Sequence, residues 1–236
     1  MPSAVLADDA VAPGGIERLR LLLLNPNTSS ATTDMMVRIA RQSADANVDI
    51  AGLTAAVGPS LITNETELAI AADGIRLSVA ALGEPKPDGI IIAAFGDPGL
   101  AAARAIAGCD VVGIAEAAMR EAALNARPFS VVTTTPHLAS AIRKRAEHYG
   151  HGDSLLSVRI TEGDVFRTMA DARGLLDALE ATARRAIDED GAQAIVVGGG
   201  PLADAARDLS ERIGIPVIEP IPAALRLITQ RRSAAS

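Results

Sequence analysis

The chain has 236 residues, a net charge of -7 at neutral pH and only 2% aromatic residues. It therefore lacks the clustered cations and the stacking platforms that nucleic-acid binding requires. Although 49% of its residues are hydrophobic, they are dispersed, and no run reaches the roughly 18 apolar residues of a membrane span. Cys109 is the only cysteine, which excludes an intrachain disulfide and a cysteine-rich metal site.

The N-terminal segment predicts a flexible tail. Residues 1–18 contain Asp8 and Asp9 but have no basic start and no long apolar stretch, so they do not resemble a signal peptide. We expect a cytoplasmic protein. The length suits one large domain or two of about 100 residues each.

Strands and helices alternate along the first half of the chain. A short strand at 21–24 is followed by a turn and a helix that ends at Ala40. The pattern then predicts strands at 48–53, 90–93 and 111–114 and helices at 66–82, 99–107 and 116–126.

The second half repeats this order. Its predicted strands are 129–132, 155–160, 194–197 and 216–218, and its predicted helices are 137–149, 172–189 and 202–213. A last helix over 222–230 is expected to return and pack on the first half. Strands separated by helices favour parallel sheets with right-handed crossovers, and therefore an α/β fold.

Two segments about 105 residues apart are copies of one pattern. In both 90–100 and 194–202 an apolar strand leads into a Gly/Pro turn and then into an Ala-rich helix. The polar turns at 25–28 and 133–136 form a second pair at a similar spacing, about 108 residues. Duplication predicts two similar α/β halves: residues 19–115 with 221–236, and residues 116–220.

The four turns are candidates for a ligand site. Ligands of parallel sheets bind beyond the carboxyl ends of the strands, where all four turns are expected, and helix starts offer N–H groups to anions. The alternative is that these residues only close turns and cap helices. The candidate substrate-binding residues are Asn27, Thr28, Phe95, Gly96, Thr133, Thr134 and Gly200, with the N–H group of Gly199 as a further donor.

Three side chains are candidates for acid–base chemistry. Asp97 precedes Pro98, which also fits an N-cap with proline at the first helical position. His137 lies at a helix start and could titrate near neutral pH, although a surface or capping role is the simpler interpretation. Glu219 ends the strand 216–218, where it is an acid–base candidate or a paired carboxylate. We expect no metal site.

Seven segments in order resemble the aspartate/glutamate/hydantoin racemase superfamily, and hydantoin racemases most. The resemblance runs from about Leu21 to Leu227 and implies two pseudo-symmetric α/β halves with the active site in the cleft between them. The segments are LLLLNPNTS, GPSLITNET, DGIIIAAFGDPGL, VVGIAEAAM, VVTTTPH, AIVVGGGPLA and IPVIEPIPAAL.

The chain departs from this family at its two most important positions. The resemblance implies a cysteine in each Gly turn, one removing a proton from the substrate and the other returning a proton to the opposite face. Ala94 and Gly199 occupy the matching positions, and neither can carry a proton. Cys109 is not a substitute, because it lies beyond the following helix.

Two functions are therefore open. One is an enzyme that acts on a small carboxylate or cyclic amide by isomerase or lyase (decarboxylase) chemistry, using Asp97, His137, Glu219 or a bound water in place of thiols. The other is a noncatalytic binder or sensor that keeps the cleft. In both cases we expect a small anionic or imide-bearing ligand, no cofactor and a homo-oligomer.

Overall fold

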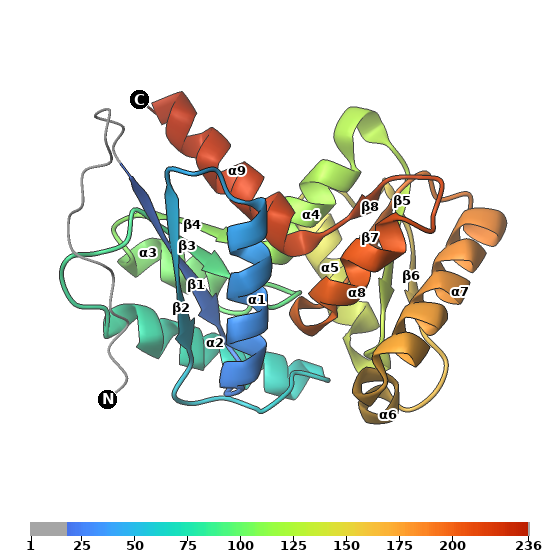
Figure 1. Ribbon diagram of the computed structural model, residues 1–236, viewed down its shortest axis with the longest axis horizontal. Coiled ribbons are helices and arrows are strands. Elements are labelled where there is room, and N and C mark those ends of the chain that lie inside the picture. Colours follow the sequence, from blue (N-terminus) through green and yellow to red (C-terminus); the bar gives the residue numbers. More distant parts are fainter. Residues whose placement is uncertain (1–17, 236) are drawn as a thin grey trace.

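The computed structural model describes residues 18–235, which form two parallel β-sheets with helices on their faces (Figure 1). The predicted tail lies outside the described residues except for Arg18, which pairs with Asp49 at 2.9 Å. None of the described helices is both long and apolar enough to cross a membrane.

The first sheet has the strand order β2-β1-β3-β4, with every neighbouring pair parallel. Its strands are β1 (Leu19–Asn25), β2 (Val48–Thr54), β3 (Gly89–Ile92) and β4 (Asp110–Gly113). The helices of this part of the chain are α1 (Ser30–Ser43), α2 (Glu65–Ala80), α3 (Leu100–Ile106) and α4 (Ile114–Ala122).

The second sheet has the order β6-β5-β7-β8 and is also parallel. Its strands are β5 (Phe129–Thr133), β6 (Leu155–Ile160), β7 (Ile195–Val197) and β8 (Val217–Ile218). The helices are α5 (Ala139–His148), α6 (Val165–Ala170), α7 (Ala172–Asp190), α8 (Ala203–Ser210) and α9 (Pro220–Ala235), and the 3-10 turns are η1 (Leu124–Ala126), η2 (Pro136–Leu138) and η3 (Gly200–Leu202).

The two sheets have the same topology, because adding four to each strand number of the first order gives the second. The turn after β3, which contains Ala94, is therefore equivalent to the turn after β7, which contains Gly199. Asn27 after β1 and Thr134 after β5 are equivalent in the same way. These observations confirm the predicted α/β fold of two pseudo-symmetric halves.

One apolar core joins the two sheets. Alternate leucines of β1 point to opposite faces, as strand geometry requires. Leu22 and Leu24 pack with α2 and α3, whereas Leu21 and Leu23 belong to a cluster that also contains Phe129 of the second sheet. That cluster includes residues of α4 and α9, which lie between the sheets in Figure 1. The final helix therefore packs on the first half, as predicted.

The predicted boundary between the halves falls inside α4. This helix contacts β4 and α9 on one side and α5, β7 and β8 on the other. The division at residue 116 stays a prediction, since α4 belongs to both interfaces.

Some predicted helix bounds were wrong. The helix expected to reach residue 126 ends at Ala122, because Asn125 and Ala126 adopt positive φ angles of 60° and 55°, which a helix cannot continue. The helix expected over 202–213 begins with η3 and ends at Ser210. α6 was not predicted, because its 6 residues are too few to show a helical period.

The close approach of α2 to the loop before it generates a stability prediction. A Cβ on Gly74 would overlap the carbonyl oxygen of Val57, which is backbone and cannot move away easily. Gly74→Ala should therefore lower the free energy of unfolding by about 1–3 kcal/mol, although alanine by itself favours a helix by about 1 kcal/mol. Gly83→Ala is the control, since nothing lies within 4 Å of its Cβ position. Urea denaturation showing equal stability for both variants would contradict this packing.

Candidate active site

The four predicted turns meet at a small cavity between the carboxyl ends of the two sheets. Its volume is about 50 Å³. The lining comes from the turns after β1, β3, β5 and β7, from the segment before α2 and from α6. The lining residues are Asn27, Leu61, Ile62, Ala93, Ala94, Phe95, Thr133, Thr134, Thr135, Leu138, Met169, Gly198, Gly199, Gly200, Pro201 and Leu202.

Glycines allow the turns of the two sheets to come this close. A Cβ on Gly200 would lie 2.8 Å from both the carbonyl oxygen of Ala93 and the sulfur of Met36, two residues of the first half. A Cβ on Gly198 would lie 2.7 Å from Val131. Any side chain at Gly200 would therefore push the halves apart.

An amide network fixes the turn after β1. Asn25 is fully buried, and its Nδ2 donates to Asn27 Oδ1 at 2.8 Å and to Thr33 Oγ1 at 3.0 Å. Asn27 Oδ1 also accepts from the N–H of Ser29 at 2.9 Å. Because Oδ1 of Asn27 is engaged in this way, its NH₂ group is the part of the amide left to donate to a ligand.

Hydroxyl groups form the equivalent polar wall after β5. Thr133 Oγ1 donates to the carbonyl oxygen of Gly198 at 2.7 Å and lies 3.1 Å from Thr135 Oγ1. Thr134 is 3% exposed, and its hydroxyl has no hydrogen-bond partner within residues 18–235. This hydroxyl is not one of the fully enclosed polar atoms without a partner in the described part of the chain, so it reaches the open space of the cavity that Thr134 lines and is available to bond a ligand.

Not every predicted donor is available. The N–H of Gly199 donates to the carbonyl oxygen of Val197 at 3.1 Å, so the prediction that it is free to bind an oxygen was wrong. Gly200 begins η3, and the N–H of a first helical residue has no acceptor within the helix. Phe95 lines the cavity, but Thr28 and Gly96 do not. Thr28 is exposed, and its N–H donates to Pro59 at 3.0 Å.

Asp97 lies outside the cavity lining, and its predicted role as the N-cap of the following helix was wrong. The N-cap of α3 is Gly99, in a left-handed conformation with φ 71°. The carboxylate of Asp97 points instead at the first turn of α4, where the N–H groups of Ala115 and Glu116 donate to it at 2.9 and 2.7 Å. It caps a helix that begins 17 residues further along the chain, since α4 starts at residue 114.

The other two acid–base candidates also lie outside the lining. His137 is exposed in η2. Glu219 is paired, with Oε2 3.5 Å from Nε of Arg207, and its carbonyl oxygen accepts from Ala223 at the start of α9. Catalytic roles for Asp97, His137 and Glu219 stay predictions that the position of the cavity does not favour.

Ala94 and Gly199 both line the cavity, from opposite halves. No thiol, carboxylate, imidazole or amine belongs to a lining side chain, because the polar residues there are asparagine and threonine. The arrangement can bind a small molecule through hydrogen bonds and apolar contact. It offers no side chain with an ordinary pKa between 3 and 11 for proton transfer.

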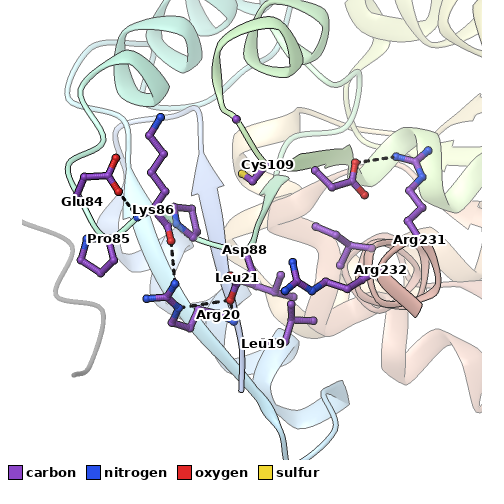
Figure 2. Close-up of a pocket in the computed structure, with 14 residues that line it drawn as sticks. Leu19, Arg20, Leu21, Glu84, Pro85, Lys86, Asp88, Cys109, Arg231 and Arg232 are labelled. Carbon is purple, nitrogen blue, oxygen red and sulfur yellow. Dashed lines mark hydrogen bonds and ion pairs between the residues drawn. The ribbon is translucent and has the colours of Figure 1, made fainter. Parts of the chain in front are cut away.

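Cys109 lines a different and larger cavity of about 830 Å³ at the amino ends of the first sheet's strands (Figure 2). Many of its charges are paired with each other: Arg20 with Asp88 at 3.4 Å and Arg231 with Asp110 at 3.6 Å. Burial, with the nearby Asp110 and Asp88, raises the pKa of the Cys109 thiol. Cys109 therefore does not supply the missing thiol.

Comparison with known proteins gives a consistent assignment. The family model described as Asp/Glu/Hydantoin racemase matches residues 21–228. The hydantoin racemase of Paenarthrobacter aurescens is 34% identical over 210 residues, which cover 89% of each chain. Allantoin racemase from Klebsiella pneumoniae superposes with a TM-score of 0.86 at 35% identity, covering 92% of this chain and 89% of the other. Allantoin racemase from Pseudomonas fluorescens gives 0.87 at 28%, covering 92% of each.

The burial of Asp97 generates a pH prediction. Burial raises its pKa from 3.8 to about 6, against hydrogen bonds from Tyr149 and the backbone that lower it. The folded state then binds the proton more tightly than the unfolded state. Asp97 therefore contributes stability that is fully present below pH 4 and is lost as the pH rises through 6.

The size of this contribution is about 3 kcal/mol. Asp97→Asn should remove it, so the difference in unfolding free energy between wild type and variant should change by that amount between pH 4 and pH 7. Urea denaturation at a series of pH values measures it. Taking the difference cancels other groups, such as Asp190, whose pKa is lowered to about 2 by Arg159. Parallel pH curves for the two proteins would contradict the prediction.

Proposed function

Because the chain belongs to the Asp/Glu/hydantoin racemase family, we propose that its cavity takes a small neutral cyclic amide of the hydantoin or allantoin class, and that turnover there does not use two thiols. The observation that carries this proposal is the lining of the cavity. It combines the Asn27 amide and the Thr134 hydroxyl with backbone groups and apolar walls, and it contains no charged side chain.

The absence of charged side chains from the cavity lining argues against a dicarboxylate substrate. A buried carboxylate needs a cation or several N–H donors to replace its lost hydration, and the lining has no lysine, arginine or histidine. The carbonyl groups of a neutral imide ring need only the single donors that Asn27 and Thr134 provide. A volume of about 50 Å³ is far below the roughly 300–1,000 Å³ of sites for larger ligands, so the cavity must widen for even a single ring to enter.

The site retains one part of a racemase mechanism and lacks the other. Removing the ring proton next to a carbonyl group leaves charge on the carbonyl oxygen, and hydrogen-bond donors aimed at that oxygen stabilise it. Asn27, Thr134 and the N–H of Gly200 are such donors. Ala94 and Gly199 carry no thiol, so a hydroxide ion from solvent takes the ring proton and becomes water, and a water on the opposite face returns a proton and becomes hydroxide. We expect slow isomerase activity.

A second candidate function is a binder or sensor without turnover. The observation that favours it is the absence of an acid–base side chain from the cavity lining. The two candidates share the ligand and differ only in whether its ring proton exchanges, so one experiment on the bound ligand separates them.

Binding is tested by calorimetry with a panel of 5-substituted hydantoins, allantoin, aspartate, glutamate and malonate. We expect heat from the cyclic amides only. Thr134→Ala should weaken their binding by about 0.5–1.5 kcal/mol, the contribution of one neutral hydrogen bond. Thr182→Ala is the matched control, because this threonine is buried in α7 and donates to Ala178. Binding of the acids alone, or equal losses in both variants, would overturn the proposed ligand class.

Proton transfer is tested by restoring the thiols with the double variant Ala94→Cys and Gly199→Cys. Gly199 has an extended backbone with φ 169°, which any residue adopts, and its Cβ would lie 3.0 Å from the movable Leu202 side chain. Since each acid–base group contributes about 10²–10⁴-fold, the variant should exchange the ring proton for deuterium at least about 10²-fold faster than wild type.

The control for this experiment is the double serine variant, which has similar size but no acidic thiol. It should exchange at the wild-type rate when followed by loss of the proton signal in deuterium oxide. Wild-type exchange as fast as that of the cysteine variant would show that the protein has another efficient acid–base pair. No exchange in wild type with tight binding would favour the sensor.

A further inference from the structure

One buried carboxylate, in the turn after β3, bonds to two other parts of the fold. Asp97 is 0% exposed, although it lies only three residues after Ala94 of the cavity. Besides the two N–H groups of α4, the hydroxyl of Tyr149 donates to its Oδ2 at 2.6 Å. Tyr149 follows the last residue of α5, so this hydrogen bond joins the turn after β3 to a helix of the second half.

Asp97 also makes a backbone hydrogen bond to a residue that lines the cavity. The N–H of Asp97 donates to the carbonyl oxygen of Ala94 at 3.0 Å, which closes the turn that lines the cavity. Asp97 also has a φ of 48°, a left-handed conformation that is uncommon for residues other than glycine. The hydrogen bonds to its carboxylate hold it in this conformation, and the turn between Ala94 and Asp97 depends on them.

The surroundings leave space for this carboxylate and for little else. The position of a Cβ on Gly113 overlaps the carboxyl group of Asp97, so only glycine fits there. Next to it, the carboxylate of Glu116 pairs with Arg104 at 2.6 Å and with Arg231 at 2.8 Å. These pairs hold the first turn of α4 against α3 and α9, and so fix the N–H groups that Asp97 accepts from.

We propose that Asp97 is a positioning residue of the cavity: through Tyr149 and the first turn of α4, it holds the Ala94 turn at the correct distance from the second half. Another polar contact between the halves, Arg38 with Asp204, is a half-exposed ion pair and contributes little. The ligand-binding part of this proposal rests on the proposed function.

The first test is Tyr149→Phe, which removes one hydrogen bond and leaves the helix cap in place. Its dissociation constant for the hydantoin that binds wild type best should rise about tenfold or more at a temperature where the protein is fully folded. Ser157→Ala is the control, because it breaks a comparable hydrogen bond to Asp190, 2.6 Å long, on β6 away from the cavity. Its dissociation constant should not change.

The second test is hydrogen–deuterium exchange without ligand. Tyr149→Phe and Gly113→Ala should speed amide exchange at 94–99 and at 114–117 at least tenfold relative to the slowest core amides. Ser157→Ala should not. A purely structural role for Tyr149 would instead lower stability and speed exchange evenly across the protein, which would overturn the proposal, as would unchanged binding in Tyr149→Phe.

The third test is the pH profile of binding. The charged or titratable groups near Asp97 are Glu116 of α4, Arg145 of α5 and Tyr149, which follows α5. Protonation of Asp97 weakens the hydrogen bonds that its carboxylate accepts, so binding by wild type should weaken as the pH falls below about 6, and this step should be absent in Asp97→Asn.

The outcomes separate the two proposals. If wild type binds none of the ring compounds, the proposed function fails and the exchange experiment alone decides the role of Asp97. If wild type binds and Tyr149→Phe binds equally well, the proposed function stands and the positioning role is wrong.

Discussion

The apolar core shared by the two sheets is the constraint on which the cavity depends. Leu21 and Leu23 of the first sheet and Phe129 and Val131 of the second belong to one buried cluster, together with residues of α4 and α9. Because each sheet buries its inner face against this cluster, neither half can turn without exposing apolar surface. The shared core therefore keeps the carboxyl edges of the two sheets facing each other.

Because the cavity lies where these two edges meet, the groups that can bind a ligand there are different from any side chain that could transfer a proton. The hydrogen-bonding groups come from buried turns, such as Asn27 held by Asn25, and from backbone at glycines. These turns are required by the fold, so they persist whether or not a thiol is present. A proton-transferring side chain is an addition to such a turn, and the turns of Ala94 and Gly199 form without one.

Electrostatics links the cavity to the rest of the molecule. The cavity has no charged lining residue, whereas a buried carboxylate lies only three residues away along the chain at Asp97. Its carboxylate accepts hydrogen bonds from N–H groups at the start of a helix, where the helix dipole is positive, and from a phenol hydroxyl. These hydrogen bonds oppose the effect of burial but do not outweigh it, so the pKa stays raised. The fold therefore holds an ionisable group close to the cavity but outside its lining.

The sequence by itself determined the strands, most helices, the duplication and the four turns, because apolar runs and glycine-proline turns are local signals that parallel sheets place at one edge. It also determined that the thiols are missing, which is a matter of residue identity. Only the tertiary structure decided which helix Asp97 caps, and that the Tyr149 hydroxyl donates a hydrogen bond to Asp97. It also decided that the N–H of Gly199 donates to the carbonyl oxygen of Val197. The contacts of Asp97 depend on how residues distant in sequence approach one another around the shared core, which no local pattern encodes. The hydrogen bond of Gly199 depends on the backbone angles of its turn, which three consecutive glycines leave open.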